Sequence, residues 1–242
     1  MIISSIDNDK IKKYSKLSKK KYRDSLGLYL VEGEHLVQEA LKVGNVEEVF
    51  ILEGSKLDYD GTYVTLDVMK KLSSMDTPSN IVCVCRKNNN CDILGKRLLL
   101  LDEVQDPGNL GTIIRSSVAF NIDTIILSDK CVDLYNPKVL RATQGMNNHI
   151  NVINMDSITC INKVKELGIC VYGTDVNNGI DVRALSNDEK SSFLLVLGNE
   201  GNGISNEVKK LIDKNLYINM NNKVESLNVG VAGSILLYEL GR

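Results

Sequence analysis

The sequence predicts an α/β protein with a mainly parallel sheet in its larger C-terminal part and a smaller α/β unit before it. Short apolar strands alternate with helical stretches from residue 97 to the C-terminus, a pattern typical of parallel sheets covered on both faces. A shorter alternation fills the first 86 residues, and the polar stretch 87–96 between the two indicates a boundary. A chain of 242 residues can hold two domains, which we place at 1–95 and 96–242.

The N-terminal unit is expected to begin with an apolar strand and an amphipathic helix that ends at Gly44. The predicted elements are strands at 28–33, 46–54, 62–67 and 80–87 and helices at 34–44 and 68–74. In the C-terminal unit, strands are predicted at 97–102, 123–127, 150–153, 169–172, 193–197 and 216–220. Ligands of such sheets bind beyond the carboxyl ends of the strands, so we look for a site there.

The charge is distributed unevenly along the chain. Eight of the 29 basic residues lie in the stretch Lys10–Arg23, which contains no acid, so the remaining 21 face all 31 acidic residues. A basic arm on an acidic body suggests a polyanionic partner, because lysines that meet phosphates release counterions. A solvated helix face is the alternative. Tyr14 and Tyr22 could stack on unpaired bases or pack the arm onto the body.

The remaining composition argues against metal, disulfide and membrane chemistry. No C-x-x-C pair occurs among Cys83, Cys85, Cys91, Cys131, Cys160 and Cys170, which we interpret as reduced residues, and no metal site is expected. His35 and His149 lack neighbours at metal-ligand spacing. No apolar run approaches the ~18 residues that span a bilayer, and the polar N-terminus lacks a signal sequence, so we expect a cytoplasmic protein.

A glycine-rich turn follows the strand at 193–197. Gly198, Gly203 and Ser205 imitate the spacing of a P-loop, but Ile204 stands where that motif needs a lysine for the β/γ-phosphates. Asn206 likewise stands where a dinucleotide-binding fingerprint needs its third glycine. The turn therefore favours a ligand with little negative charge, and an NTP-dependent enzyme is disfavoured.

Two further polar stretches lie at strand ends. In "LDEVQDPGNLGTIIR", Asn109 is expected to cap a helix from which Arg115 projects, and in "INMNNKVESLNVGVAGSILLYEL", Ser226 is expected to cap the last helix. That helix is apolar enough to be buried, and Gly230 and Gly233 allow a close approach of another backbone.

Together these stretches closely resemble the three motifs of the SpoU family of RNA ribose 2'-O-methyltransferases, in the SPOUT superfamily. The motifs are "NLGTIIR", "LGNEGNGI" and "INMNNKVESLNVGVA", and "LRATQGM" matches a fourth family segment. The resemblance covers about residues 98–242, and the part before it looks like the L30e-type substrate-binding domain of many members. Asn219 and Asn222 depart from the family's proline and glycine, which affects the rigidity of the loop.

The resemblance implies a C-terminal trefoil knot that binds S-adenosylmethionine. The cofactor-binding residues that it implies are Thr174, Leu197, Gly198, Asn199, Gly201, Ile218, Met220, Ser226 and Leu227. The catalytic residues that it implies are Asn109, Arg115, Glu200, Ser226 and Asn228. Family accounts let the arginine remove the hydroxyl proton, but a guanidinium has a pKa above ~12. We therefore expect Arg115 to clamp a phosphate and stabilise the developing alkoxide.

The expected substrate is RNA, most simply 23S-type ribosomal RNA, bound by a homodimer that forms through the catalytic domain. The predicted RNA contacts are Lys10, Lys12, Lys13, Lys16, Lys19, Lys20, Lys21, Arg23 and Arg141. Two alternatives stay open. One is a tRNA ribose 2'-O-methyltransferase, and the other is a non-catalytic RNA-binding or ribosome-assembly protein on the same scaffold.

Overall fold

The computed structural model describes residues 2–90, 92–176, 179–221 and 223–241, so Cys91 and Asn222 lie outside the described residues. The chain forms two compact units, and the first is built from two separate stretches. It comprises Met1–Asn89 and Asp133–Asn148, whereas the second comprises Asn90–Val132 and His149–Arg242. The α/β class, with a smaller unit before the larger one, is confirmed, but the sequence did not indicate that residues 133–148 pack with the first unit.

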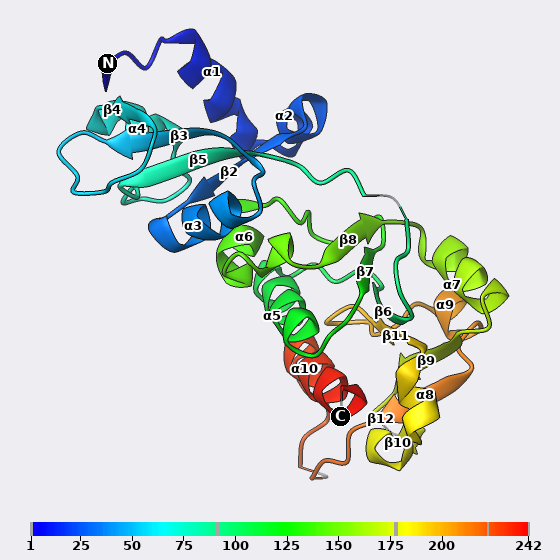
Figure 1. Ribbon diagram of the computed structural model, residues 1–242. Coiled ribbons are helices and arrows are strands. Elements are labelled where there is room, and N and C mark those ends of the chain that lie inside the picture. Colours follow the sequence, from blue (N-terminus) through cyan, green and yellow to red (C-terminus); the bar gives the residue numbers. More distant parts are fainter. Residues whose placement is uncertain (1, 91, 177–178, 222, 242) are drawn as a thin grey trace. The chain divides into compact units, whose positions relative to one another are not determined.

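The first unit is a five-stranded mixed sheet of order β1-β4-β3-β5-β2 with helices on it (Figure 1). Its elements are β1 (Ile2–Ile3), α1 (Asp9–Ser15), η1 (Lys16–Ser18), α2 (Lys20–Leu26), β2 (Leu28–Glu32), α3 (Glu34–Lys42), β3 (Val46–Leu52), β4 (Thr62–Val64), α4 (Leu66–Leu72), β5 (Ile81–Arg86), α6 (Pro137–Thr143) and η2 (Met146–Asn148). Helices α1 and α4 bury Ile11, Tyr14 and Met69 against the sheet with Phe50. Helix α6 packs on β2.

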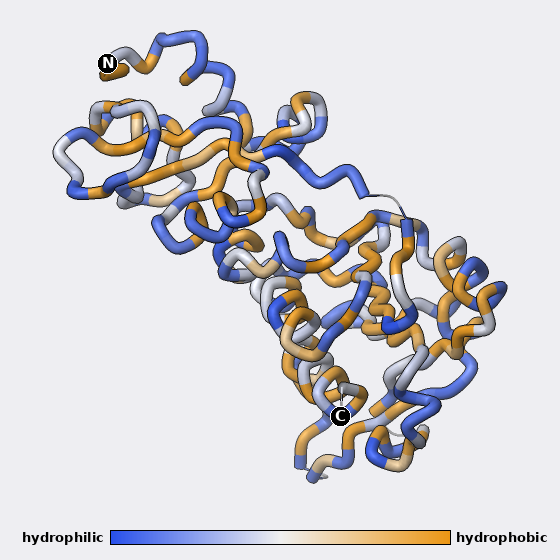
Figure 2. The backbone as a smooth tube through the Cα atoms, in the orientation of Figure 1, coloured by the Kyte–Doolittle hydropathy of each residue, from blue (hydrophilic) through white to orange (hydrophobic). Residues whose placement is uncertain are grey.

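The second unit is a seven-stranded parallel sheet of order β10-β12-β9-β11-β6-β7-β8. Its elements are β6 (Arg97–Leu101), α5 (Pro107–Ala119), β7 (Thr124–Leu127), β8 (Asn151–Asn154), α7 (Ser157–Glu166), β9 (Cys170–Thr174), β10 (Ile180–Asp181), η3 (Val182–Ala184), α8 (Asn187–Ser191), β11 (Phe193–Leu197), α9 (Asn206–Lys209), β12 (Lys214–Tyr217) and α10 (Val229–Leu240). The adjacent strands β11 and β6 are apolar and buried (Figure 2), except for Arg97 at the start of β6. Helices α7 and α9 cover one face, and α5 and α10 pack together (Figure 1).

Three local predictions were wrong. The predicted strand 216–220 is β12, which ends at Tyr217, so Ile218 and Met220 lie in the loop that follows. Helix α5 is capped by Asp106, with Pro107 in its first turn, and Asn109 is instead a buried residue within the helix. Helix α10 is capped by Asn228 rather than by Ser226, and the helix that was expected to be buried leaves Val231 and Tyr238 exposed.

The described cysteines are free thiols: Cys83, Cys85 and Cys160 are buried, and Cys131 and Cys170 are partly exposed. No helix within the described ranges is both long and apolar enough to cross a membrane. Among the residues that the structure describes, no cluster of three His, Cys, Asp or Glu side chains could hold a metal ion.

Arg97 joins the C-terminal ends of α5 and α10. Its Nη2 donates to the carbonyl oxygens of Phe120 at 3.1 Å and of Leu240 at 3.2 Å. The guanidinium thus satisfies two carbonyls that their helices leave unpaired, at the negative ends of both helix dipoles. We expect Arg97→Met to lower the free energy of unfolding by about 2 to 3 kcal/mol, because both charge-assisted bonds are lost. Urea denaturation measures this, and an equal effect of Lys96→Met, at the exposed neighbouring position, would contradict it.

Candidate active site

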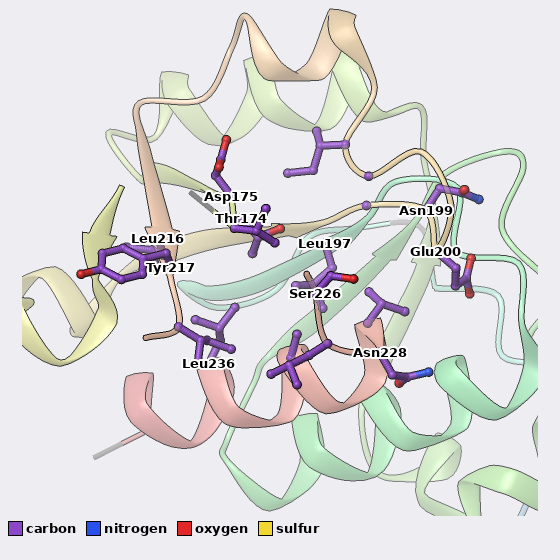
Figure 3. A pocket seen from close by; sticks show the side chains of 18 of the residues that line it. Thr174, Asp175, Leu197, Asn199, Glu200, Leu216, Tyr217, Ser226, Asn228 and Leu236 are labelled. Carbon is purple, nitrogen blue, oxygen red and sulfur yellow. The ribbon is translucent and has the colours of Figure 1, made fainter. Parts of the chain in front are cut away.

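A pocket of about 540 Å³ opens at the carboxyl ends of β9, β11 and β12, where the parallel sheet predicts a ligand site. Its walls come from the turn after β11, residues 174–176 at the end of β9, the loop after β12 and α10. Figure 3 shows Asn199 and Glu200 at one end and Leu216 and Tyr217 at the other, with Ser226 and Leu197 between them. This volume is within the usual range for a small-molecule or cofactor site.

All nine residues for which the resemblance implies cofactor binding line this one pocket. Of the predicted catalytic residues, Glu200, Ser226 and Asn228 line it, whereas Asn109 and Arg115 do not. The prediction missed Asp175 and Tyr217. Asp175 directly follows β9, and Tyr217 is the last residue of β12. The rule that ligands bind beyond the carboxyl ends of strands could therefore have found both.

The charge of the lining is one-sided. No lysine, arginine or histidine belongs to it within the described residues, and its charged side chains are Asp175 and Glu200. The other walls are backbone and apolar side chains such as Leu197, Ile218 and Leu227. A pocket of this kind suits a neutral or cationic ligand better than a phosphate, because its described lining holds two carboxylates and no lysine, arginine or histidine. The glycine-rich turn lacks the lysine of a P-loop, and the described lining of the pocket likewise contains no basic side chain.

The glycine-rich turn folds back tightly on itself. Gly198 lies so close to the backbone of Gly203 and Ile204 that a Cβ would stand 2.2 Å from their atoms. The backbones of Asn199 and Gly203 exchange two hydrogen bonds, of 3.0 and 2.9 Å. The Asn199 side chain accepts from the backbone of Gly201 and donates to the carbonyl oxygen of Glu103. Position 198 therefore needs glycine, because any larger residue would clash with this backbone.

Glu200 connects this turn to the loop between β6 and α5. One carboxylate oxygen accepts from the backbone N–H of Asp106 and from Asn109 Nδ2, both at 3.0 Å, and the other accepts from the backbone N–H of Gln105 at 3.2 Å. Burial acts to raise the pKa of Glu200, but the hydrogen bonds from Asn109 and the two backbone groups outweigh it, and its pKa is lowered. Glu200 is thus an ionised acceptor whose oxygens are both engaged, which suits positioning better than proton transfer.

The same network continues into the last helix. Asn109 is 8% exposed, and its Oδ1 accepts from Asn228 Nδ2 at 2.8 Å. The Asn228 Oδ1 in turn accepts from the backbone N–H groups of Gly230 and Val231 and caps α10. One residue from each of the three sequence motifs thus contributes to a single chain of hydrogen bonds, Glu200 to Asn109 to Asn228. The sequence placed these residues in one site but gave no sign of their direct contacts.

Arg115 lies apart from this network. It is in the third turn of α5, with an exposed side chain, and within the described ranges it makes no hydrogen bond or ion pair. An arginine with all five donors available can bind an anion from outside the unit, and its fork matches a phosphate. Asn219 is exposed in the loop after β12, where Asn222 is outside the described residues.

The lysines of the arm differ in how far they are already neutralised. Lys10 pairs with Glu48, Lys12 with Asp7 and Lys20 with Asp24, at 2.8 to 3.0 Å. Lys13 and Lys16 lie over the rings of Tyr14 and Tyr22. Lys19 and Lys21 are exposed and have no charged partner within the part of the chain that the structure describes.

Tyr14 and Arg23 of the arm have packing roles. Tyr14 is 5% exposed and contacts the ring of Phe50, so it packs the arm onto the body. Burial first, and then the nearby Glu48, raise the pKa of Tyr14 to about 12. Arg23 is 4% exposed and bonds to Asp133, so its side chain is largely shielded from solvent. Arg141 is on α6 and donates to Ser74 Oγ at 2.9 Å.

Comparisons with known proteins agree on both parts of the chain. A model described as the SpoU rRNA Methylase family matches residues 96–238, and one described as the MRM3-like substrate binding domain matches residues 8–83. The 23S rRNA (guanosine(2553)-2'-O)-methyltransferase RlmP of Bacillus subtilis is 37% identical over 245 residues, 98% of each chain. An AdoMet-bound rRNA methyltransferase from Sinorhizobium meliloti is 26% identical, with a TM-score of 0.86 over 99% of this chain and 97% of that one. The SpoU methyltransferase AviRb from Streptomyces viridochromogenes is 25% identical, with a TM-score of 0.82 over 97% of each chain.

Proposed function

The chain belongs to the SpoU rRNA methylase family, and from this premise we propose that it methylates a ribose 2'-hydroxyl of 23S-type ribosomal RNA with S-adenosylmethionine. The observation that carries the proposal is the pocket formed by the second and third motifs without any basic side chain among its described residues. A neutral adenosine and a cationic sulfonium fit such a lining, whereas a nucleotide phosphate does not.

The pocket residues fit S-adenosylmethionine by their chemistry. The narrow turn at Gly198 offers backbone groups, Leu197, Ile218 and Leu227 offer apolar surface, and Asp175 and Glu200 supply negative charge. When bound there, the cofactor supplies an electrophilic methyl group. The nine lining residues named from the sequence are those that we propose hold it.

Arg115, Asn109 and Asn228 would act on the RNA. We propose that Arg115 binds the phosphate beside the target ribose and stabilises negative charge that develops on the 2'-oxygen. Asn109 and Asn228 would orient the ribose, since their amides are fixed by Glu200 and by the start of α10. Holding the hydroxyl oxygen in line for the displacement can itself lower the barrier by several kcal/mol, about 7 or more in well-oriented systems.

The cofactor part of the proposal is tested by isothermal titration calorimetry of the purified full chain. We expect heat of binding with S-adenosylmethionine and with S-adenosylhomocysteine, and none with ATP, because the lining contains two carboxylates and no described cation. Binding of ATP in place of S-adenosylmethionine would contradict the assignment of the pocket.

The substrate part is tested with labelled S-adenosylmethionine and purified RNAs. Ribosomal RNA is favoured over tRNA because the relative that matches 98% of the chain acts, by its name, on 23S rRNA. We expect methyl transfer to 23S rRNA at a ribose. Transfer to tRNA alone would favour the tRNA enzyme, and transfer to no RNA would favour a non-catalytic protein.

We propose that the arm binds RNA chiefly through the lysines that lack a local acid. Lys19→Ala with Lys21→Ala should lower the slope of log K against log salt by about 2, since each lysine that contacts a phosphate contributes about 1. Lys10→Ala with Lys12→Ala should change the slope less, because Glu48 and Asp7 already neutralise those ammonium groups. Filter binding over a salt series measures both slopes, and equal changes would contradict the distinction.

A homodimer formed through the catalytic domain is also proposed, with the cytoplasm as its location. The dimer is supported by the exposed side chains of α10, which is a strongly apolar helix. Its Val231 and Tyr238 are 46% and 44% exposed. Covering such side chains is favourable by the hydrophobic effect. Light scattering should give twice the chain mass of 26.8 kDa, and a monomer would contradict the proposal.

A further inference from the structure

Helix α6 and its flanking residues are part of the first unit although they lie between two strands of the second in sequence. The ring of Tyr135 packs on that of Tyr29, with centroids 4.5 Å apart, and its hydroxyl accepts from the backbone N–H of Asn88 at 2.9 Å. At the other end of the segment, Asn148 Oδ1 accepts from Tyr29 and Asn45 at 3.4 Å. The segment is thus fixed to the sheet of the substrate-binding unit at both ends.

The strongest of these attachments is the ion pair between Arg23 and Asp133. Arg23 Nη2 donates to Asp133 Oδ2 at 2.6 Å, and Nε donates to the same oxygen at 3.2 Å. Its Nη1 donates to the carbonyl oxygens of Leu17 and Ser18. The side chains of Arg23 and Asp133 are 5% and 16% exposed, so this pair is largely shielded from solvent. Arg23 therefore joins the basic arm to the first residue of the inserted segment.

The segment that is held in this way is basic. Within residues 133–148 the basic side chains are Lys138 and Arg141, and the one acidic side chain is Asp133, which is already paired with Arg23. The two side chains are three residues apart on α6 and so lie on one face of it. Lys138 is exposed and makes no side-chain hydrogen bond or ion pair within the described residues.

Arg141 is held by a second buried group. Glu32 is 7% exposed and accepts from the hydroxyls of Ser73 and Ser74, both at 2.6 Å. The Ser74 Oγ accepts from Arg141 Nη1 at 2.9 Å. One nitrogen of the guanidinium is thus fixed, and in the described structure its Nε and Nη2 make no hydrogen bond, so they can donate to an external anion.

We propose that α6 presents Lys138 and Arg141 to the phosphate backbone of the RNA, and that Arg23 is a positioning residue for this helix rather than an RNA contact. The proposal rests on the proposed function for the identity of the polyanion. It adds Lys138 to the RNA-binding surface and gives Arg23 a different role from the one that its place among the lysines predicts.

The surface part of the proposal is tested with Lys138→Ala/Arg141→Ala in the full chain. We expect RNA affinity at 0.1 M salt to fall roughly tenfold and the salt slope to fall by about 2, with unchanged affinity for S-adenosylmethionine. The control is Lys56→Ala/Lys163→Ala, which removes the same charge from two exposed lysines away from α6, one in the loop after β3 and one on α7. An equal loss of RNA affinity in both double variants would overturn the proposal, because a general charge effect would then explain it.

The positioning part predicts the sign of a second effect. Asp133→Asn removes a negative charge, so it should strengthen RNA binding if Arg23 contacted RNA directly. If Arg23 positions α6, the same change weakens RNA binding, and adding it to Lys138→Ala/Arg141→Ala has little further effect. Unchanged or stronger binding by Asp133→Asn would overturn this role. Methyl transfer by the unmodified chain at saturating RNA is measured alongside, so a failure of the proposed function is recognised separately.

Discussion

Replacing Arg115 with lysine is expected to lower the rate of methyl transfer about 100-fold, the loss typical of removing one well-placed electrostatic group. Lysine keeps the positive charge but has no planar fork, so it cannot bind two phosphate oxygens in the same way. The affinity for S-adenosylmethionine should not change, because Arg115 is exposed, lies outside the pocket lining and has no partner within the described ranges.

Single-turnover assays with saturating RNA and cofactor measure the rate, and calorimetry measures the affinity. Arg183→Lys is the matched control, since Arg183 is an exposed arginine of the same unit that pairs with Asp181. Nearly full turnover by Arg115→Lys would show that fork geometry is irrelevant. A lower affinity for the cofactor with an unchanged rate would instead place Arg115 at the cofactor site.

Replacing Glu200 with glutamine should reduce both cofactor affinity and turnover, each by roughly tenfold or more. The carboxylate accepts three hydrogen bonds through its two oxygens, and a glutamine would direct its NH₂ group at one of these donors. Leaving a donor unpaired costs about 1 to 3 kcal/mol. Because the bonds join the cofactor turn to the loop that precedes α5, both binding and positioning should suffer.

Glu207→Gln, at an exposed glutamate on α9, controls for the loss of charge. Calorimetry measures the loss of cofactor affinity, and single-turnover assays measure the loss of rate. An effect confined to turnover, with normal cofactor binding, would mean that Glu200 acts on the RNA and does not shape the pocket.

The pKa of Glu200 also predicts a pH dependence. Its folded-state pKa lies below the ordinary value of 4.5, so the contribution of the charged form to stability is complete above that value and is lost as pH falls through the lower folded-state pKa. Cofactor affinity, corrected for protonation of the ligand, should therefore stay level from pH 8 to about pH 5. A decline centred near pH 6 would require another group.

The pocket residues could be predicted from the sequence because they follow directly from strand ends and from the family motifs. Helix caps could not be predicted as reliably. Asp106 and Asn109 are both good cap residues three positions apart, and only the contact of Asn109 with Glu200 and Asn228 decides between them. That contact joins residues about 90 to 120 positions apart, which no local pattern can indicate.

Arg23 illustrates a similar limit. In sequence it is the last residue of a basic run, so composition assigns it to the surface. The structure buries it because Asp133, which is 110 residues away, supplies a partner. A charged side chain can be buried when it is paired and hydrogen-bonded, and that condition depends on tertiary structure.

The division of the first unit into two stretches has a consequence for how the protein acquires its structure during synthesis. A ribosome that makes about 5 to 20 residues per second needs roughly 3 to 12 s to extend the chain from Asn89 to Asn148. Through that interval the nascent N-terminal sheet lacks α6, and Arg23 lacks its acidic partner. The N-terminal unit therefore cannot mature before β6 and β7 of the other unit have also been translated.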